Sequence, residues 1–455
     1  MILKTKLFGK IYQFSSVMDV MAKANEEKSG DRLAGIAAVN AEERVAAKVV
    51  LSQLTLNDLF NHPAISYEED EVTRIIIDDI NIKIFNQIKN WTVEQLREWI
   101  LDFDTTDHEI KYIARGITAE MVAAACKLMT NMDLIYAANK INITKTANTT
   151  IGEAGRFSAR LQPNHPTDDI DGILASTMEG LTYGIGDALI GLNPVDDSTE
   201  SIKRILHKFE EFRNKWEIPT QTCVLAHVKT QIEAVRQGAP TGLIFQSIAG
   251  SEKGNTAFGF SAADLHEAKE LMMKEGQVAG PNVLYFETGQ GSELSSNAHN
   301  GVDQLTMEAR CYGFAKRFDP YVVNTVVGFI GPEYLYDSKQ VIRAGLEDHF
   351  MGKLSGLSMG CDVCYTNHMK ADQNDAENLA VLLGTAGVNF VMGIPNGDDV
   401  MLNYQTTGYH ETATLRELLN KRPIKEFETW MQNLGFMEAG KLTKLAGDAS
   451  VFLQR

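Results

Sequence analysis

Eight short apolar runs alternate with longer amphipathic segments from about residue 148 onward, and this alternation limits the possible folds more than any other feature of the chain. Strand-length apolar runs separated by helix-length amphipathic segments are typical of β-α units. Two of the intervening segments carry clear helix signals, because 196–219 opens with aspartate and serine caps and ends at Pro219, and 261–276 opens on Ser261 and closes on Gly276. The eight runs end near Gln162, Asn193, His227, Ser247, Glu287, Phe329, Asp362 and Asn396.

Eight consecutive β-α units predict a closed (β/α)8 TIM barrel of the α/β class, for which roughly 250 residues are typical. An open, doubly wound sheet could also use eight strands, but it usually has a glycine-rich phosphate-binding turn after its first strand. No such turn follows the first run, which ends near Gln162. We therefore favour the barrel and keep the open sheet as the alternative.

The regions on either side of the predicted barrel have a different pattern. We expect a mostly helical N-terminal region over residues 1–110, the barrel over 111–420 and a short helical C-terminal extension over 421–455. Apolar residues recur at three- and four-residue steps in the first region, which indicates amphipathic helices. We also expect short helices at 91–101 and 118–131, joined by a polar connection.

Composition and charge argue against several classes of protein. The chain has 455 residues, 44% of them hydrophobic, which is ample for a large buried core. Its formal net charge of -17 argues against a nucleic-acid partner, which would need a basic face. No window approaches about 18 uninterrupted apolar residues, and the N-terminus lacks the apolar core and cleavage site of a secretion signal. Five cysteines form an odd, sparse set that suits a reducing cytosol, so we expect an enzyme without a membrane partner.

Polar side chains gather where the predicted strands end. In a (β/α)8 barrel these ends meet at one mouth, which carries the active site. Buried polar groups cost roughly 1–3 kcal/mol each unless they are paired, so several of them at one mouth favour a binding site. The alternative is that they satisfy one another and cap loops. The polar ends are Arg160, Gln162, Asn193, Gln246, Ser247, Glu287, Asp362 and Asn396.

The types of these side chains indicate a ligand. The carboxylates of Glu287 and Asp362 would repel each other in a dry cavity unless a cation lies between them or one is protonated. A metal normally adds histidines, yet His227 is the histidine at a strand end, no H-x-H or H-E-x-x-H occurs, and Arg160 opposes a metal. We therefore predict no metal site, and favour an organic amine with a polar second group, which Arg160, Gln162 and Asn193 would contact.

Three other motifs are less informative. Cys361 and Cys364 form a single C-x-x-C pair without a second pair for zinc, and they flank a strand end where a redox pair would begin a helix. The glycine- and serine-rich stretch 289–297 is a weak phosphate cradle but suits a tight loop against a large cofactor. The stretch 264–269, DLHEAK, lacks the glycine of the D-x-H-x-x-G motif that carries an axial histidine in some cobalamin proteins, so we interpret it as an ordinary helix.

Long stretches of the chain resemble the large, catalytic subunit family of ethanolamine ammonia-lyases over essentially the whole length. Two positions depart from the usual pattern of that family, Lys316 for arginine and Ser358 for proline, and neither lies at a predicted strand end. The matching stretches are 147–169 (ANTTIGEAGRFSARLQPNHPTDD), 184–198 (GIGDALIGLNPVDDS), 242–255 (GLIFQSIAGSEKGN), 282–316, 326–337 (VVGFIGPEYLYD) and 356–368 (GLSMGCDVCYTNH).

The resemblance implies a barrel that holds adenosylcobalamin at its mouth, a separate small subunit, and conversion of ethanolamine to acetaldehyde and ammonia. It also implies an oligomer of heterodimers, and a cytoplasmic location within a bacterial microcompartment. Because D-x-H-x-x-G is missing, we expect the cofactor to keep its own base on cobalt. The rival hypotheses are a metal-dependent barrel hydrolase or aldolase, and a noncatalytic scaffold.

By resemblance, individual positions receive roles. Arg160, Glu287 and Asp362 are the expected catalytic residues. The expected substrate contacts are Arg160, Gln162, Asn193, Glu287 and Asp362, with Phe329 as a further pocket residue. The expected cofactor contacts are Pro194, Gln246, Ser295 and Met401.

Overall fold

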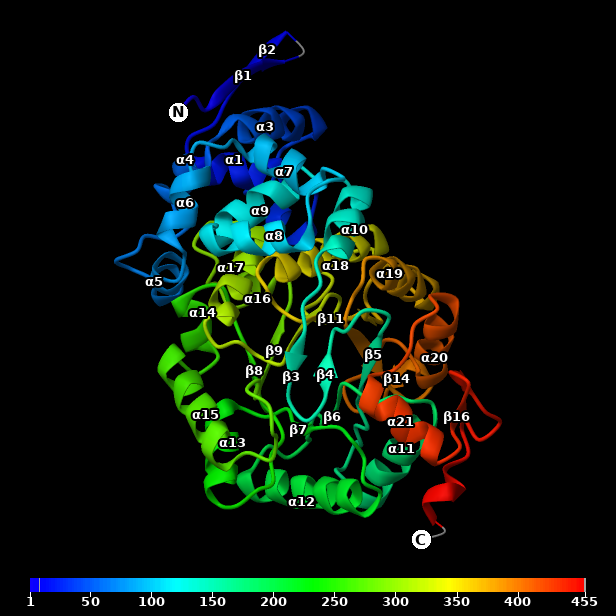
Figure 1. Cartoon of the computed structure of the whole chain (residues 1–455). Helices are drawn as coiled ribbons and strands as arrows, with labels where there is room; N and C mark the ends of the chain where they lie inside the picture. The colour runs from blue at the N-terminus through cyan, green and yellow to red at the C-terminus, as the bar shows by residue number, and fades with distance from the viewer. Residues whose placement is uncertain (8, 454–455) are drawn as a thin grey trace.

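Eight parallel strands form a barrel in the computed structural model of the protein, which describes residues 1–7 and 9–453 (Figure 1). Seven neighbouring pairs share a ladder, in the order β7-β6-β5-β13-β11-β10-β9-β8. The remaining gap is bridged where the N–H groups of Gly242 and Leu243 donate to the carbonyl of Thr222, at 3.1 and 3.0 Å. The barrel and all eight predicted strands are therefore confirmed. The strands are β5 (Ser158–Leu161), β6 (Leu189–Leu192), β7 (Thr222–Val224), β8 (Ile244–Ser247), β9 (Leu284–Thr288), β10 (Val322–Val326), β11 (Met359–Asp362) and β13 (Phe390–Gly393).

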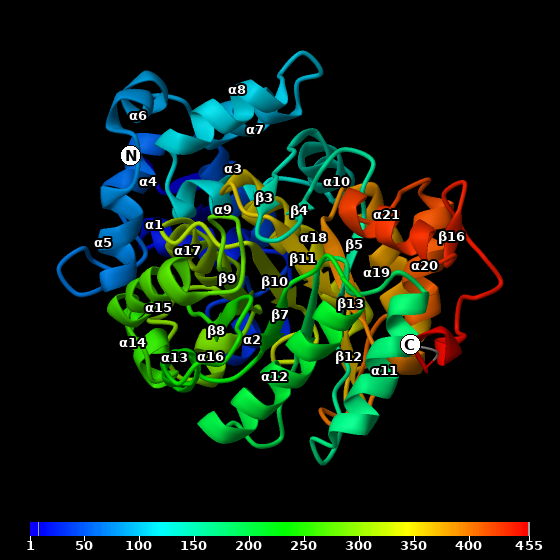
Figure 2. The same cartoon turned by 60° about the horizontal axis from the view of Figure 1, so that its bottom comes forward.

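A helix follows each strand and covers the outside of the barrel (Figure 2). The two helices with the clearest signals begin where predicted, since Ser198 caps α12 and Ser261 caps α15. The surrounding helices are α11 (Ile170–Thr182), α12 (Thr199–Lys215), α13 (Val228–Arg236), α14 (Glu252–Ala257), α15 (Ala262–Glu275), α16 (Ser292–Ser295), α17 (Gln304–Lys316), α18 (Ser338–Leu354), α19 (Gln373–Thr385) and α20 (Tyr409–Leu418).

The N-terminal region is helical, as expected, but it opens with a two-stranded hairpin that the periodicity did not indicate, β1 (Lys4–Leu7) and β2 (Lys10–Gln13). The expected polar connection between the short helices is itself helical, because Thr106 and Glu109 form a capping box that starts a further helix. That helix contains the expected boundary at residue 110. The helices are α1 (Val17–Ala24), α2 (Ser29–Leu33), α3 (Ala41–Gln53), α4 (Leu56–Phe60), α5 (Glu71–Asp78), α6 (Ile82–Ile88), α7 (Val93–Leu101), α8 (Asp107–Ile113), η1 (Ala114–Gly116), α9 (Ala119–Lys127) and α10 (Asn131–Lys140).

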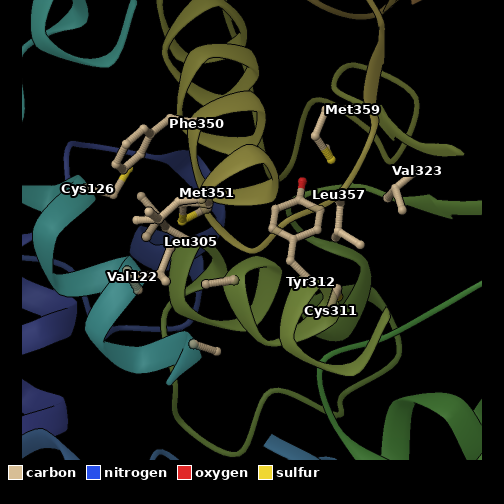
Figure 3. Packing of buried hydrophobic residues seen from close by; sticks show 14 of the residues in the cluster. Val122, Cys126, Leu305, Cys311, Tyr312, Val323, Phe350, Met351, Leu357 and Met359 are labelled. Carbon is tan, nitrogen blue, oxygen red and sulfur yellow. The ribbon is translucent and has the colours of Figure 1, made fainter. Parts of the chain in front are cut away.

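One hydrophobic core joins the N-terminal helices to the barrel. Figure 3 shows Val122 and Cys126 of α9 facing Leu305 of α17 and Phe350 and Met351 of α18. All five side chains are almost completely buried, so this contact removes a large apolar area from water at about 25 cal/mol per Å². The N-terminal helices and the barrel therefore share a packed interface.

A buried ion-pair cluster ties the same two parts together. The guanidinium of Arg310 on α17 donates to Asp70 before α5 at 2.7 Å, to Glu120 on α9 at 2.6 Å and to the carbonyl of Gly250 at 2.8 Å. Removing one partner of a buried pair costs about 3–5 kcal/mol. We therefore expect Arg310→Ala to lower the free energy of unfolding by about that amount in a denaturant titration.

Arg317→Ala is the matched control for that prediction. Arg317 lies directly after α17 and pairs with Asp79 at 2.6 Å, but its side chain is 31% exposed. Partly exposed pairs contribute about 0–1 kcal/mol. Equal losses of stability in the two variants would contradict the assignment of Arg310 as the link between the N-terminal helices and the barrel.

A small hairpin closes the bottom of the barrel, where the strands begin. It consists of β3 (Lys145–Thr146) and β4 (Thr150–Ile151), and the backbone and side chain of Asn148 between them bond Gln221 and Thr220, which precede β7. The C-terminal extension contains the predicted helix but also a second hairpin: α21 (Lys425–Asn433), β16 (Met437–Glu438), β17 (Lys441–Leu442) and η3 (Ala449–Leu453). With the bottom closed, a ligand must enter from the end where the strands terminate.

Candidate active site

A cavity of about 700 Å³ lies at the C-terminal ends of the strands. A small three-stranded sheet on the loops after β11 and β13 forms part of its wall: β12 (Tyr365–Thr366), β14 (Asp398–Asp399) and β15 (Tyr404–Gln405). Eight of the ten predicted site residues line the cavity. Seven of them were predicted at strand ends, and Pro194 was predicted from the family resemblance. These eight are Arg160, Gln162, Asn193, Pro194, Gln246, Glu287, Phe329 and Asp362.

Arg160 forms the buried base of the cavity. Its Nη1 donates to the hydroxyl of Tyr285 at 2.7 Å and to Oε1 of Glu287 at 2.9 Å, and its Nη2 donates to Oδ1 of Asn193 at 2.9 Å. Burial disfavours the charge, but the neighbouring Tyr285 and Glu287 outweigh it and raise the pKa of Arg160. Arg160 is therefore a permanent cation that holds side chains from two other strands.

Glu287, the second-last residue of β9, has one carboxylate oxygen engaged and the other available. Its Oε1 accepts from Arg160, from Tyr285 and from Nδ2 of Asn324 at 3.3 Å. Asn324 lies opposite Glu287 in the β9-β10 register, which explains the contact. No side chain of the described residues donates to Oε2, and the side chain is 14% exposed toward the cavity that it lines. Oε2 can therefore accept a hydrogen bond from a ligand.

Asp362 ends β11 in a fully buried position. Its Oδ1 accepts from the hydroxyl of Thr406 at 2.5 Å, and its Oδ2 accepts from the hydroxyl of Tyr404 at 3.0 Å. Burial, with the nearby charge of Glu287 in addition, raises the pKa of Asp362 to about 7. Its carboxyl group can therefore gain and lose a proton near neutral pH, as proton transfer requires.

Two side-chain amides complete the polar part of the cavity. Nε2 of Gln162 donates to Asp399 at 2.7 Å and to the hydroxyl of Tyr404 at 2.9 Å. Asn193 accepts from Arg160 through its oxygen. Among the described residues, none bonds Oε1 of Gln162 or Nδ2 of Asn193, so an acceptor and a donor remain for a ligand.

The other predicted residues lie at or near the mouth. Phe329 lies three residues beyond the end of β10 and packs edge-on against Tyr404, with ring centroids 5.4 Å apart. Ser295 ends α16 and is exposed, and Met401 is half-buried between β14 and β15. Neither lines the cavity. Asn396, expected at a strand end, is exposed in a left-handed turn after β13, so it does not join the site.

The cysteines are buried thiols, and both ring nitrogens of His227 are hydrogen-bonded. All five cysteines are free and buried, and burial raises the pKa of Cys361 and of Cys364 well above its usual range. Nε2 of His227 bonds the carbonyl of Phe258 at 2.9 Å, and its Nδ1 accepts from the N–H of Lys229. Within residues 1–7 and 9–453, no three His, Cys, Asp or Glu side chains are grouped as metal ligands.

Sequence reasoning missed five functional side chains. Tyr285 and Asn324 lie inside apolar runs, and the two-residue alternation of a strand places Tyr285 on the same face as Glu287. That signal could have found Tyr285. Asp399, Tyr404 and Thr406 come from the loop after β13, where no periodic pattern indicates which side chains turn inward.

Barrel enzymes carry their catalytic residues at the C-terminal ends of the strands. The closed bottom, the cavity at the other end and the paired charges inside it therefore define the chain as a (β/α)8-barrel enzyme. Comparisons with known proteins narrow this class. The family described as "Ethanolamine ammonia lyase large subunit (EutB)" matches residues 12–445. The chain belongs to this family and is a lyase.

Individual relatives agree with the family match. The chain is 59% identical over 450 residues to the ethanolamine ammonia-lyase large subunit of Escherichia coli strain K12, covering 99% of both chains. It has the same identity and coverage to that of Salmonella typhimurium strain LT2. Among solved structures, a crystal structure of HydG, a maturase of the [FeFe]-hydrogenase, aligns with a TM-score of 0.42 at 11% identity over 72% of this chain and 75% of that one.

Proposed function

We propose that this chain is the catalytic subunit of an adenosylcobalamin-dependent radical lyase that converts ethanolamine to acetaldehyde and ammonia. The observation that carries the proposal is the arrangement of unengaged groups in the cavity. Oε2 of Glu287 and Oε1 of Gln162 are acceptors that suit an ammonium group, and Nδ2 of Asn193 is a donor that suits a hydroxyl oxygen. A two-carbon amino alcohol carries both groups.

The protein's own residues then act on the two ends of the substrate. Glu287 and ionised Asp362 hold the ammonium and attract its charge. Asp362 takes up or returns a proton at the nitrogen as the amino group leaves, because its pKa of about 7 permits both. Arg160 supports the oxygen end, where negative character develops, by fixing Asn193 and by its own charge.

The size of the cavity supports a site for part of a cobalamin. A volume of about 700 Å³ is in the range that encloses a drug-sized ligand, whereas a corrinoid is larger and would extend beyond it. Val195 and Phe329 are 52% and 41% exposed at the mouth and offer apolar surface. The residues that would hold the cofactor are Pro194, Gln246, Ser295 and Met401. A cofactor bound there would supply the radical chemistry of the reaction.

The expectation that the cofactor keeps its own base on cobalt is supported by His227, the histidine of the cavity lining, because both of its ring nitrogens are engaged. A spin-resonance spectrum of the cob(II)alamin state that shows a protein histidine nitrogen would refute it.

The proposed partner is a small subunit, in line with the name of the related large subunits. The decisive experiment mixes the purified chain, a small subunit, adenosylcobalamin and ethanolamine, and measures acetaldehyde. We expect product from the complete mixture and none when any component is omitted. Turnover without the small subunit or without the cofactor would contradict the proposal.

Assembly and location form a separate part of the proposal. None of the helices in the described part of the chain has the length and apolar character that a membrane crossing requires. We expect an oligomer of heterodimers in the cytoplasm, inside a bacterial microcompartment, with ethanolamine as the small-molecule partner. Light scattering of the complex and fractionation of cells test these expectations.

The activity should depend on pH through Asp362. Burial raises the pKa of this carboxyl group to about 7, so lowering the pH through this value adds a proton and removes the charge that holds the ammonium. We expect kcat/KM for ethanolamine to fall about tenfold for each pH unit below the pKa of Asp362. The steady-state rate from pH 5.5 to 8.5 measures this dependence, and an acid limb that persists in Asp362→Asn would assign it to another group.

A further inference from the structure

Asp399 is a buried carboxylate beside the cavity to which the proposed function assigns no role. It lies in β14 and is 4% exposed. Its Oδ2 accepts from Nε2 of Gln162 at 2.7 Å and from Nδ2 of Asn164 at 2.8 Å. Its Oδ1 accepts from the backbone N–H groups of Met401 at 3.0 Å and Leu402 at 2.7 Å. One carboxylate therefore joins the end of β5 to the loop after β13.

The negative charge of Asp399 determines which way the amide of Gln162 points. The oxygen and the NH2 group of a side-chain amide are similar in size, so its hydrogen-bond partners decide between its two orientations. An ionised carboxylate accepts and cannot donate, so the NH2 group of Gln162 must face Asp399. The second hydrogen of that NH2 goes to the hydroxyl of Tyr404 at 2.9 Å. The amide oxygen of Gln162 is left toward the cavity.

Arg160 determines the opposite orientation at Asn193. A guanidinium donates and cannot accept, so the amide oxygen of Asn193 must face Arg160, and its NH2 group is left free. Asn164 supports both positions, because its oxygen accepts from the N–H of Asn193 at 2.8 Å while its NH2 binds Asp399. The cavity thus presents an amide acceptor at one position and an amide donor at another.

We propose that Asp399 is a positioning residue that determines substrate specificity: it holds the Gln162 amide so that the carbonyl oxygen meets the ammonium end of the amino alcohol. This inference rests on the proposed function, since it takes ethanolamine as the substrate. With the amide reversed, an NH2 group would face the ammonium and repel it. Neutral asparagine at position 399 would permit that reversal, because its own NH2 would bond the oxygen of Gln162.

The orientation of the Gln162 amide also affects the hydrogen bonds of Asp362, through the hydroxyl of Tyr404. The hydroxyl of Tyr404 accepts from Gln162, so its proton points to Oδ2 of Asp362 at 3.0 Å. If the amide turns, that hydroxyl donates to the oxygen of Gln162 and Asp362 loses a donor. The charged and titratable groups around Asp362 are Arg160 from β5, Glu287 from β9, Tyr404 from β15 and its chain neighbours Cys361 and Cys364. The substitution also removes the charge of Asp399 in β14, which opposes this effect, but that charge acts from beyond Tyr404 whereas the lost donor bonds Asp362 directly. The acid limb of the rate should therefore move to higher pH.

The test compares Asp399→Asn with Asp398→Asn in the complex with small subunit and adenosylcobalamin. Asp398 is the adjacent carboxylate and is exposed, so its substitution makes the same change of charge without touching Gln162. Hydrogen bonds to charged groups correspond to about 10- to 150-fold in an equilibrium constant. We expect Asp399→Asn to raise KM for ethanolamine by about that factor and to shift the acid limb of kcat/KM upward, and Asp398→Asn to do neither.

Two further measurements separate positioning from a general structural role. Calorimetric titration of the complex with ethanolamine in the absence of adenosylcobalamin should show the same loss of affinity. In the double variant Asp399→Asn with Gln162→Glu, the carboxylate at 162 again presents an oxygen to the ammonium, so affinity should recover at least about tenfold over Asp399→Asn alone.

The outcomes distinguish the two proposals. If the unmodified complex does not convert ethanolamine, the proposed function fails. If it does, while Asp399→Asn keeps the affinity and acid limb of Asp398→Asn, the role of Asp399 is wrong. It is equally wrong if Asp399→Asn is misfolded and the double variant folds without recovering affinity.

Discussion

Replacing Asp362 by alanine should lower kcat for ethanolamine by about a hundred- to ten-thousand-fold, which is the usual contribution of a group that transfers a proton. The carboxyl group is buried, lies in one cavity with Glu287 and has a pKa near 7. Its removal leaves the hydroxyls of Thr406 and Tyr404 without their acceptor and the substrate ammonium with one carboxylate instead of two. Acetaldehyde and ammonia release by the assembled complex measure the effect.

The fold of that variant should survive, because Asp362 bonds hydroxyls of the mouth loop and no part of the hydrophobic core. Asp398→Ala removes an exposed carboxylate from β14, in the small sheet that carries Tyr404, and serves as the control, with activity within about twofold of the unmodified chain. Circular dichroism and thermal unfolding should agree among all three proteins. Near-normal ammonia release from Asp362→Ala would show that this carboxyl group does not take part in the chemistry.

Much of the fold could be predicted because strands of a barrel are buried on both faces. Such strands leave continuous apolar runs, and the run over β10 or β13 is visible without any knowledge of its neighbours. The hairpin of β1 and β2 has no continuous apolar run that could have predicted it, because its residues are all exposed or half-exposed.

The candidate site could be predicted where it depends on strand ends and not where it depends on loops. Glu287 and Asp362 follow apolar runs directly, so the barrel rule places both at the mouth. Tyr404 lines the same cavity and Asp399 lies beside it, because the chain turns through Asn396 and Gly397, both with positive φ, and nothing in the local pattern indicates that direction. The same turn explains why Asn396 itself faces solvent.

The family resemblance and the chemistry of the residues differed in how well they predicted which residues line the cavity. Ser295 and Met401 came from the resemblance alone, and the structure places them near the mouth without making them part of the cavity. The arginine, the carboxylates and the two amides were chosen from chemistry first. The alternative, in which the polar strand ends only bond one another, is partly correct. Arg160 bonds the oxygen of Asn193 and Asp399 bonds the NH2 group of Gln162, and the other end of each amide is left for a ligand.

Arg160→Lys is the most informative change at the base of the cavity. The guanidinium bonds Tyr285 and Glu287 through Nη1 and Asn193 through Nη2, and the single nitrogen of a lysine cannot occupy both positions. Asn193 is then free to turn, and the donor that it presents to the substrate hydroxyl is lost even though a positive charge remains at position 160. We expect kcat/KM to fall by about a hundred- to a thousand-fold, as when a donor to a developing negative charge is removed.

Arg416→Lys provides the comparison that separates catalysis from burial. Arg416 is another buried arginine, and it bonds Asp187 at 3.0 Å and the carbonyls of Phe157 and Gly184 away from the cavity. Both lysine variants should lose stability, because each leaves buried acceptors without donors. At temperatures where both proteins are folded, kcat/KM should fall in Arg160→Lys and should not fall in Arg416→Lys. A parallel fall in Arg416→Lys would mean that the loss follows from weakened packing, and the orientation of Asn193 by Arg160 would then have no special part in binding the hydroxyl end of the substrate.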